Sequence, residues 1–158
     1  MANTIKFFTE DTPFQTKHKT ILRLWLSKLL QAEGVSRFTV NIILCSDKYL
    51  RKLNKEYLGH NYVTDVISFN YNETDCLTGD VFISIDRVRE NAGLFEVTVY
   101  HELYRVMAHG TLHLAGYDDA TTALRADMKK KEDYYISLLL IQLNRPNKPG
   151  NNAITSKK

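Results

Sequence analysis

Arg37-Phe-Thr-Val-Asn-Ile-Ile-Leu-Cys45 is rich in β-branched and aromatic residues, a composition typical of a buried β-strand. Ser46 and Asp47 follow it directly and predict the start of a helix, which Gly59 is placed to end. A strand that passes straight into a helix is typical of domains in which helices cover a sheet. We therefore expect both kinds of element to alternate along the chain.

Further strands and helices are predicted on both sides of this pair. Further short strands are predicted at residues 4–8, 66–69 and 81–85. Helices are predicted from Thr12-Pro13 to a left-handed cap at Gly34, from Asp86 to Gly93, over residues 96–115 and over residues 121–143. The sequence thus predicts a single α/β (α+β) domain, with a mixed sheet of about four strands covered by about five helices.

The length of 158 residues fits one ordinary domain, which we assign to residues 1–143. Residues 144–158 contain two prolines and a glycine and lack apolar periodicity, which predicts a disordered tail. This tail carries four basic residues and no acidic one, so the formal net charge of +3 leaves the domain itself close to neutral. Any attraction to nucleic acid must come from local patches or from a bound metal.

The composition argues against export and against a membrane span. No stretch approaches the roughly 18 consecutive apolar residues of a membrane helix. Glu10 and Asp11 come too early for the apolar core of a secretory signal. Cys45 and Cys76 lie far apart without Cys-x-x-Cys spacing, which favours reduced thiols over a disulfide. We expect a soluble, cytoplasmic protein with no membrane partner.

Two histidines and an aspartate have the spacing of metal ligands. His109 and His113 are four residues apart, so on a helix both imidazoles point from one face. Gly116 can break that helix and return Asp119 to them, which gives the pattern H-x-x-x-H-x-x-G-x-x-D. This is the ligand spacing of the metzincin zinc proteases, with aspartate in place of their third histidine. Three protein ligands leave a position for water, which predicts a catalytic zinc site for metal-assisted hydrolysis.

The pattern does not fix the general base. The zinc proteases place a glutamate directly after the first histidine, and here that residue is Gly110, which argues against a peptidase. Glu102, two helical turns before His109, and Asp118, beside the third ligand, are the candidates. Glu102 could equally orient a histidine or pair with Arg105. Three further histidines lack ligand-spaced partners and are expected at the surface: His18, His60 and His101.

The run from His109 to Asp119, His-Gly-Thr-Leu-His-Leu-Ala-Gly-Tyr-Asp-Asp, resembles the signature H-G-x-L-H-L-x-G-Y-D-H of the YbeY family of bacterial endoribonucleases. Residues 53–57 and 64–69 resemble the second block of that family, and residues 79–84 resemble its third block. The resemblance covers about residues 1–143, with the blocks in the right order. It implies a single α/β domain with one zinc ion on His109, His113 and residue 119. It also implies a role in maturing the 3′ end of small-subunit ribosomal RNA, and in ribosome assembly and quality control. The substrate cleft would be formed in part by Thr64, Asp65, Ser68 and Phe69.

Two positions depart from the family pattern. The third ligand is normally histidine, and Asp119 adds negative charge, which should weaken the Lewis acidity of the ion and favour harder metals such as manganese. An arginine normally follows the tyrosine of the second block, and here that residue is Leu58. Since such an arginine would clamp a phosphate, its replacement puts catalytic efficiency in question.

Four basic residues recur at helical spacing after the strand at residues 37–45: Lys48, Arg51, Lys52 and Lys55. One explanation is an ordinary solvated helix face. The other is a basic stripe that guides an RNA backbone, in which Lys52 and Lys55 bind the substrate.

The leading hypothesis is a metal-dependent endoribonuclease that cleaves single-stranded RNA, with ribosomal RNA and the small ribosomal subunit as partners and no DNA. The alternative is an RNA-binding or ribosome-binding assembly factor with little catalytic activity, which the replacement by Leu58 favours. A metallopeptidase comes third. An iron oxygenase with two histidines and one carboxylate comes fourth, because nothing else in the sequence indicates a site for an oxidant.

Overall fold

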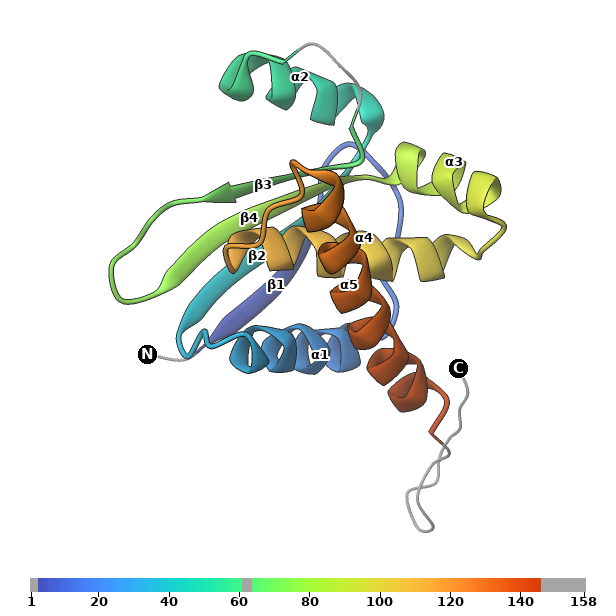
Figure 1. Ribbon diagram of the computed structural model, residues 1–158. Coiled ribbons are helices and arrows are strands. Elements are labelled where there is room, and N and C mark those ends of the chain that lie inside the picture. The colour runs from blue at the N-terminus through green and yellow to red at the C-terminus, as the bar shows by residue number, and fades with distance from the viewer. Residues whose placement is uncertain (1–2, 61–63, 146–158) are drawn as a thin grey trace.

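The computed structural model describes residues 3–60 and 64–145 (Figure 1). Its elements are, in chain order, β1 (Thr4–Thr9), α1 (Lys19–Ala32), β2 (Phe38–Cys45), α2 (Asp47–Leu58), β3 (Val66–Asn70), β4 (Leu77–Ser84), α3 (Ile85–Phe95), α4 (Val99–Leu114) and α5 (Thr122–Leu143). They form a single mixed α/β domain, so the predicted fold class is confirmed. The predicted disorder of the tail falls largely on residues 146–158, outside the described residues.

The sheet is mixed, with the strand order β1-β2-β4-β3. β1 pairs in parallel with β2, and β2 with β4, whereas β3 runs antiparallel to β4. The side chains of Ile42 on β2 and of Val81, its partner on β4, are fully buried. Central strands covered on both faces need such apolar runs, which explains why the sequence of β2 is so distinctive.

Helices cover the two faces of the sheet unequally (Figure 1). On one face α1 and α4 pack against the strands, and α5 packs across both helices, which encloses the main apolar core. On the other face α2 packs over β3 and β4 around a smaller cluster of Cys45, Leu50 and Ile67. The two clusters lie on opposite sides of the central strands, so the sheet is buried from both sides.

Helix α4 lies so close to the sheet that glycine is required at the contact. A Cβ atom on Gly110 would lie 2.5 Å from Val81 Cγ1, and one on Gly79 would lie 2.7 Å from Leu114 Cδ2. The Ser68 hydroxyl on β3 donates a hydrogen bond of 2.9 Å to the Gly110 carbonyl. Strands β3 and β4 therefore fix the position of α4 by direct contact with its backbone.

The first helix begins later than predicted. Residues 12–18 are irregular and α1 starts at Lys19, although Thr12 and Pro13 carry the pattern of a helix start. Phe14 packs against Tyr100 of α4, with ring centroids 5.6 Å apart, and lies against the main core. The predicted start at Thr12 is wrong because this tertiary contact outweighs the local capping preference.

The short helix α3 is also displaced from its predicted bounds. Ser84 caps it by accepting a backbone N–H three residues on, whereas Asp86 accepts the N–H of Asp47 at the start of α2, at 2.7 Å. The helix runs past Gly93 to Phe95, and the C-cap residue Glu96 adopts a left-handed φ of 57°. The prediction of Asp86 and Gly93 as its two ends is therefore wrong. At the start of the helix the reason is that the Asp86 carboxylate accepts a hydrogen bond from the backbone of α2 instead of capping α3.

Other boundaries agree more closely with the sequence. Gly34 and Gly59 adopt left-handed φ values of 89° and 69° after α1 and α2, as predicted. β4 begins at Leu77, earlier than predicted, and α4 begins at Val99 behind a cap at Thr98. Among the described residues, no helix is both long and apolar enough to cross a bilayer.

Gly110→Ala is expected to lower the free energy of unfolding by about 1–3 kcal/mol, because its methyl group would overlap the Val81 side chain. The higher helix propensity of alanine, worth about 1 kcal/mol, offsets part of this loss. Gly93→Ala is the matched control, since a Cβ atom there meets nothing within 4 Å, and it should stabilise the protein. Urea denaturation measures both. Equal stability of the two variants would contradict the close packing of α4.

Candidate metal centre

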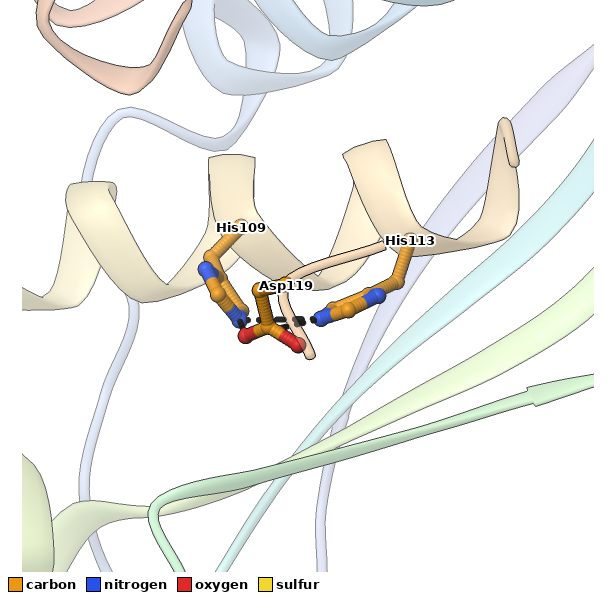
Figure 2. A group of neighbouring side chains, drawn as sticks. All are labelled: His109, His113 and Asp119. Atoms are coloured by element: carbon orange, nitrogen blue, oxygen red, sulfur yellow. Dashed lines mark hydrogen bonds and ion pairs between the residues drawn. The ribbon is translucent and has the colours of Figure 1, made fainter. Parts of the chain in front are cut away.

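Helix α4 and the loop after it bring the three predicted ligands together, as Figure 2 shows. The Nε2 atoms of His109 and His113 lie 3.1 Å apart, and Asp119 Oδ2 lies 3.3 Å and 3.4 Å from them. Around a tetrahedral ion with bonds of about 2.0–2.1 Å, neighbouring ligand atoms are about 3.3–3.4 Å apart. The three atoms thus stand at the spacing that such an ion requires, and they could hold one.

The orientation of His109 is set by a carboxylate from α5. Glu132 Oε2 lies 2.5 Å from His109 Nδ1, and Glu132 is buried. Because an ionised carboxylate only accepts hydrogen bonds, this contact places the ring proton on Nδ1 and leaves Nε2 free to bind an ion. Burial alone would lower the pKa of His109, but the hydrogen bond and charge of Glu132 raise it above the ordinary value. Glu132 therefore selects the tautomer of His109 that can act as a ligand.

Arg105 forms an ion pair with the second carboxylate oxygen of Glu132, the one that does not contact His109. Arg105 Nη1 lies 3.0 Å from Glu132 Oε1, and Nη2 lies 2.7 Å from Asp133 Oδ1. Glu132 was not among the site residues predicted from the sequence, although its position carried a signal. It shares a face of α5 with the buried residues Met128 and Tyr135, and a carboxylate on an apolar face needs a partner. In the structure its partners are Arg105 and His109.

The loop that carries Asp119 is anchored at several points. Gly116 turns the chain with a φ of 108°, and the Tyr117 hydroxyl donates a short hydrogen bond to the Glu33 carboxylate at the end of α1. Asp118 Oδ1 accepts the N–H of Asp119 at 2.7 Å and that of the following residue at 3.2 Å. The Asp118 carboxylate is thus engaged in shaping the turn, which leaves Asp119 directed at the histidines.

Glu33 joins this loop to two helices. Its carboxylate also accepts from the Tyr135 hydroxyl at 2.5 Å and from Lys131 Nζ at 3.2 Å. Burial by itself would raise the pKa of Glu33, but the hydrogen bonds from Tyr117, Tyr135 and Lys131 outweigh it, so the pKa is lowered. An ionised Glu33 therefore ties the ligand loop to α1 and α5 at neutral pH.

Glu102 lies on α4 two turns before His109 and is only 3% exposed. Burial, and then the charge of Asp65, raise the pKa of Glu102 to about 7, against a smaller opposing effect of Arg105. The alternative of a Glu102–Arg105 ion pair is not what forms, because Arg105 directs its guanidinium to carboxylates of α5. Glu102 instead faces a cavity that it shares with His109 and Asp119.

Two cavities meet at the ligands. The α5-side cavity, of about 710 Å³, extends towards α3 and α5, and the α2-side cavity, of about 590 Å³, extends towards α2 and β3. Both are lined by Asp65, Val66, His109 and Asp119. Binding sites for small organic ligands measure about 300–1,000 Å³, so each is large enough for one. His109 and Asp119 therefore lie between the two cavities, whereas His113 lines only the α2-side cavity.

The α2-side cavity collects three of the four residues predicted to form the cleft, namely Thr64, Asp65 and Ser68. Phe69 lines neither of the two cavities. Its ring packs against Tyr57 and Phe82, with centroids 6.1 Å and 5.8 Å away, in the cluster under α2. Phe69 thus supports the wall of the cleft from behind.

The α2-side cavity is also lined by Leu58, whose side chain is 43% exposed and offers no hydrogen-bond donor. Lys52 and Lys55 are exposed on α2 and line neither cavity.

Of the three histidines expected at the surface, only His60 is exposed, and it lines the α2-side cavity. His18 is half-buried in a left-handed conformation before α1, and His101 is half-buried on the α5-side cavity.

Comparisons with known proteins find related sequences and a similar fold. The family model described as endoribonuclease YbeY matches residues 4–139. A protein of Cytophaga hutchinsonii named endoribonuclease YbeY is 47% identical over 136 residues, which cover 85% of this chain and 95% of its own. One of Flavobacterium psychrophilum with the same name is 42% identical over 137 residues, covering 87% and 98%. The solution structure of TM1509 from Thermotoga maritima is similar with a TM-score of 0.63 and 28% identity, covering 94% of this chain and all of that one.

Glu132→Gln is expected to weaken metal binding about 10- to 100-fold, because a neutral amide neither fixes the His109 tautomer as firmly nor raises the basicity of the imidazole. Competition with a chromophoric chelator at constant pH gives the dissociation constant for zinc, and this measurement does not depend on enzymatic activity.

Asp133→Asn is the matched control, since Asp133 binds the same arginine from a side chain that is 52% exposed. It should change the dissociation constant less than about threefold. If both variants bound zinc like the wild type, Glu132 would have no role at the metal centre.

Proposed function

Because the chain belongs to the endoribonuclease YbeY family, we propose that it is a zinc-dependent endoribonuclease that cleaves single-stranded RNA. The observation that carries the proposal is the set of three ligand atoms, 3.1–3.4 Å apart, at the junction of two cavities. The finer role that we propose is maturation of the 3′ end of small-subunit ribosomal RNA and ribosome quality control in the cytoplasm, with the small ribosomal subunit as partner.

The ligands suit zinc chemically. Two imidazole nitrogens and one carboxylate oxygen form a donor set found in catalytic zinc sites, where the protein leaves a position open. When bound, zinc lowers the pKa of water from about 15.7 towards 7 and polarises a phosphoryl oxygen. Asp119 supplies a hard oxygen donor, so manganese is the other ion that we expect this site to accept.

We assign the proton transfer to Glu102. A carboxyl group whose pKa is about 7 can both accept and donate a proton near neutral pH, and Glu102 faces the same cavity as His109 and Asp119. Asp118, the other candidate, uses Oδ1 to hold the turn before α5. Its proposed contribution is therefore the placement of Asp119.

The RNA would enter along the α2-side cavity. Thr64, Asp65 and Ser68 offer hydroxyl and carboxylate groups there, and Phe69 supports the strand that carries them. Lys52 and Lys55, exposed on α2, would attract the phosphate backbone over this entrance.

Two alternatives have different support. The apolar Leu58 on the α2-side cavity favours an RNA-binding or ribosome-binding assembly factor with little catalysis, because no guanidinium extends from this position towards a phosphate. A metallopeptidase has less support, since a side chain at position 110 would meet Val81 of the sheet and could not serve as the base beside His109.

The test is cleavage of a labelled single-stranded RNA by the zinc-loaded protein, by His113→Ala, and by protein stripped of metal with a chelator and then resupplied with zinc. We expect cleavage by the wild type, a loss of at least about 100-fold in the variant and the stripped protein, and recovery with zinc.

A contaminating ribonuclease would act equally in all these samples. RNA binding by the wild type without cleavage would favour the assembly-factor alternative. Neither binding nor cleavage would reject the proposed function.

A further inference from the structure

The α5-side cavity extends well beyond Glu102 and the metal ligands that line it. It measures about 710 Å³ and continues from the ligands past Met128 of α5 to Phe95 at the end of α3. Apolar side chains with a few polar groups among them are the usual lining of a binding site for an organic ligand. The roles given to His109, Asp119 and Glu102 leave most of this space unassigned.

Of the cations that line this cavity, one differs from the others. Arg105 is ion-paired with Glu132 and Asp133, and Lys129 lies 3.6 Å from Asp133. The guanidinium of Arg125 makes no ion pair with any carboxylate of the described residues. Its charge is therefore the one in this cavity that an anion could neutralise without breaking an existing pair.

Neutral oxygen atoms of the ligand loop and of the first turn of α5 hold Arg125. Its Nη1 lies 3.4 Å from the Asp119 carbonyl and 3.5 Å from the Ala120 carbonyl, and Nη2 lies 3.3 Å from the Thr122 hydroxyl. These distances exceed the usual 2.9–3.0 Å, so the hydrogen bonds are weak and can be exchanged for bonds to phosphate oxygens. The loop thus places a planar donor group next to the third ligand.

The same cavity is also lined by an exposed aromatic ring. Phe95 is 61% exposed and lines the cavity, whereas its neighbour Leu94 is 70% exposed and does not. Proteins that bind single-stranded nucleic acid combine such rings, on which bases stack, with cations that contact the backbone. Asp65 and Glu102 also line this cavity but are less exposed than Arg125, so a phosphate should bind at the exposed end near Arg125.

We propose that the α5-side cavity is a second RNA subsite, in which Arg125 binds a phosphate and Phe95 stacks on a base. The two cavities share Asp65, His109 and Asp119, so a strand that runs from one to the other passes the ligands. The nucleotides on the two sides of the cleaved bond therefore occupy different cavities. This inference rests on the proposed function and extends it to the substrate beyond the cleaved bond.

The experiment measures steady-state cleavage of a single-stranded RNA by zinc-loaded protein at several salt concentrations. Arg125→Ala should raise KM about tenfold, because a charged hydrogen-bonding partner of the phosphate is lost, with kcat changed less than about twofold. The slope of log(kcat/KM) against log salt should become shallower by about 0.7, the value for one phosphate contact on a single strand. Arg125→Lys should lie between the wild type and Arg125→Ala.

Phe95→Ala should raise KM about fivefold or more through the loss of base stacking, without changing the salt dependence. Leu94→Ala is its matched control, because Leu94 is similarly exposed but does not line the cavity. Arg145→Ala is the control for charge, since Arg145 lies beyond the opposite end of α5 and lines a different groove. Thermal unfolding of each variant verifies that these surface changes leave the fold intact.

If Arg125→Ala behaved like Arg145→Ala, and Phe95→Ala like Leu94→Ala, while the wild type cleaved RNA, the subsite would be rejected and the proposed function would stand. If the wild type neither bound nor cleaved RNA, both would fall together.

Discussion

The packing of α4 against β3 and β4 leaves no room for a Cβ atom at Gly110 or Gly79. This contact decides the rest of the site, because α4 carries Glu102, His109 and His113 on the side turned towards the cavities. Two hydrogen bonds hold the helix in register with β3. The Ser68 hydroxyl donates to the Gly110 carbonyl at 2.9 Å, and the Asn70 side-chain amide donates to the Leu114 carbonyl at 3.2 Å. The strand that lines the α2-side cavity is thereby fixed relative to the ligands.

The third ligand depends on a different part of the molecule. Asp119 comes from the loop between α4 and α5, and the buried Glu33 carboxylate ties that loop to α1 and α5. From α5, Glu132 reaches back to His109 and selects its tautomer. Two buried carboxylates thus position the metal centre without occupying it, and each is stabilised by cationic or hydroxyl donors that offset the cost of burial.

Much of this arrangement follows from local sequence. The spacing of His109 and His113 on a helix, and the left-handed turn at Gly116, suffice to predict the ligand set. The apolar face of α5 marks Glu132 as a buried carboxylate, but the sequence could not show that its partner is His109, which lies 23 residues away on another helix. The same holds for Phe14, whose contact with Tyr100 replaces the predicted helix start, and for Phe69, which packs behind the cleft. Patterns within one element were predictable, whereas contacts between elements were not.

The most direct test of the account is X-ray absorption spectroscopy of the zinc-loaded protein, which reports the atoms bound to the ion and their distances. The account predicts two imidazole nitrogens at about 2.0–2.1 Å and a carboxylate oxygen at about 2.0–2.2 Å, with the imidazole signal reduced by half in His113→Ala. A sulfur ligand at about 2.3 Å, or a spectrum unchanged in that variant, would show that zinc binds elsewhere and would contradict the account.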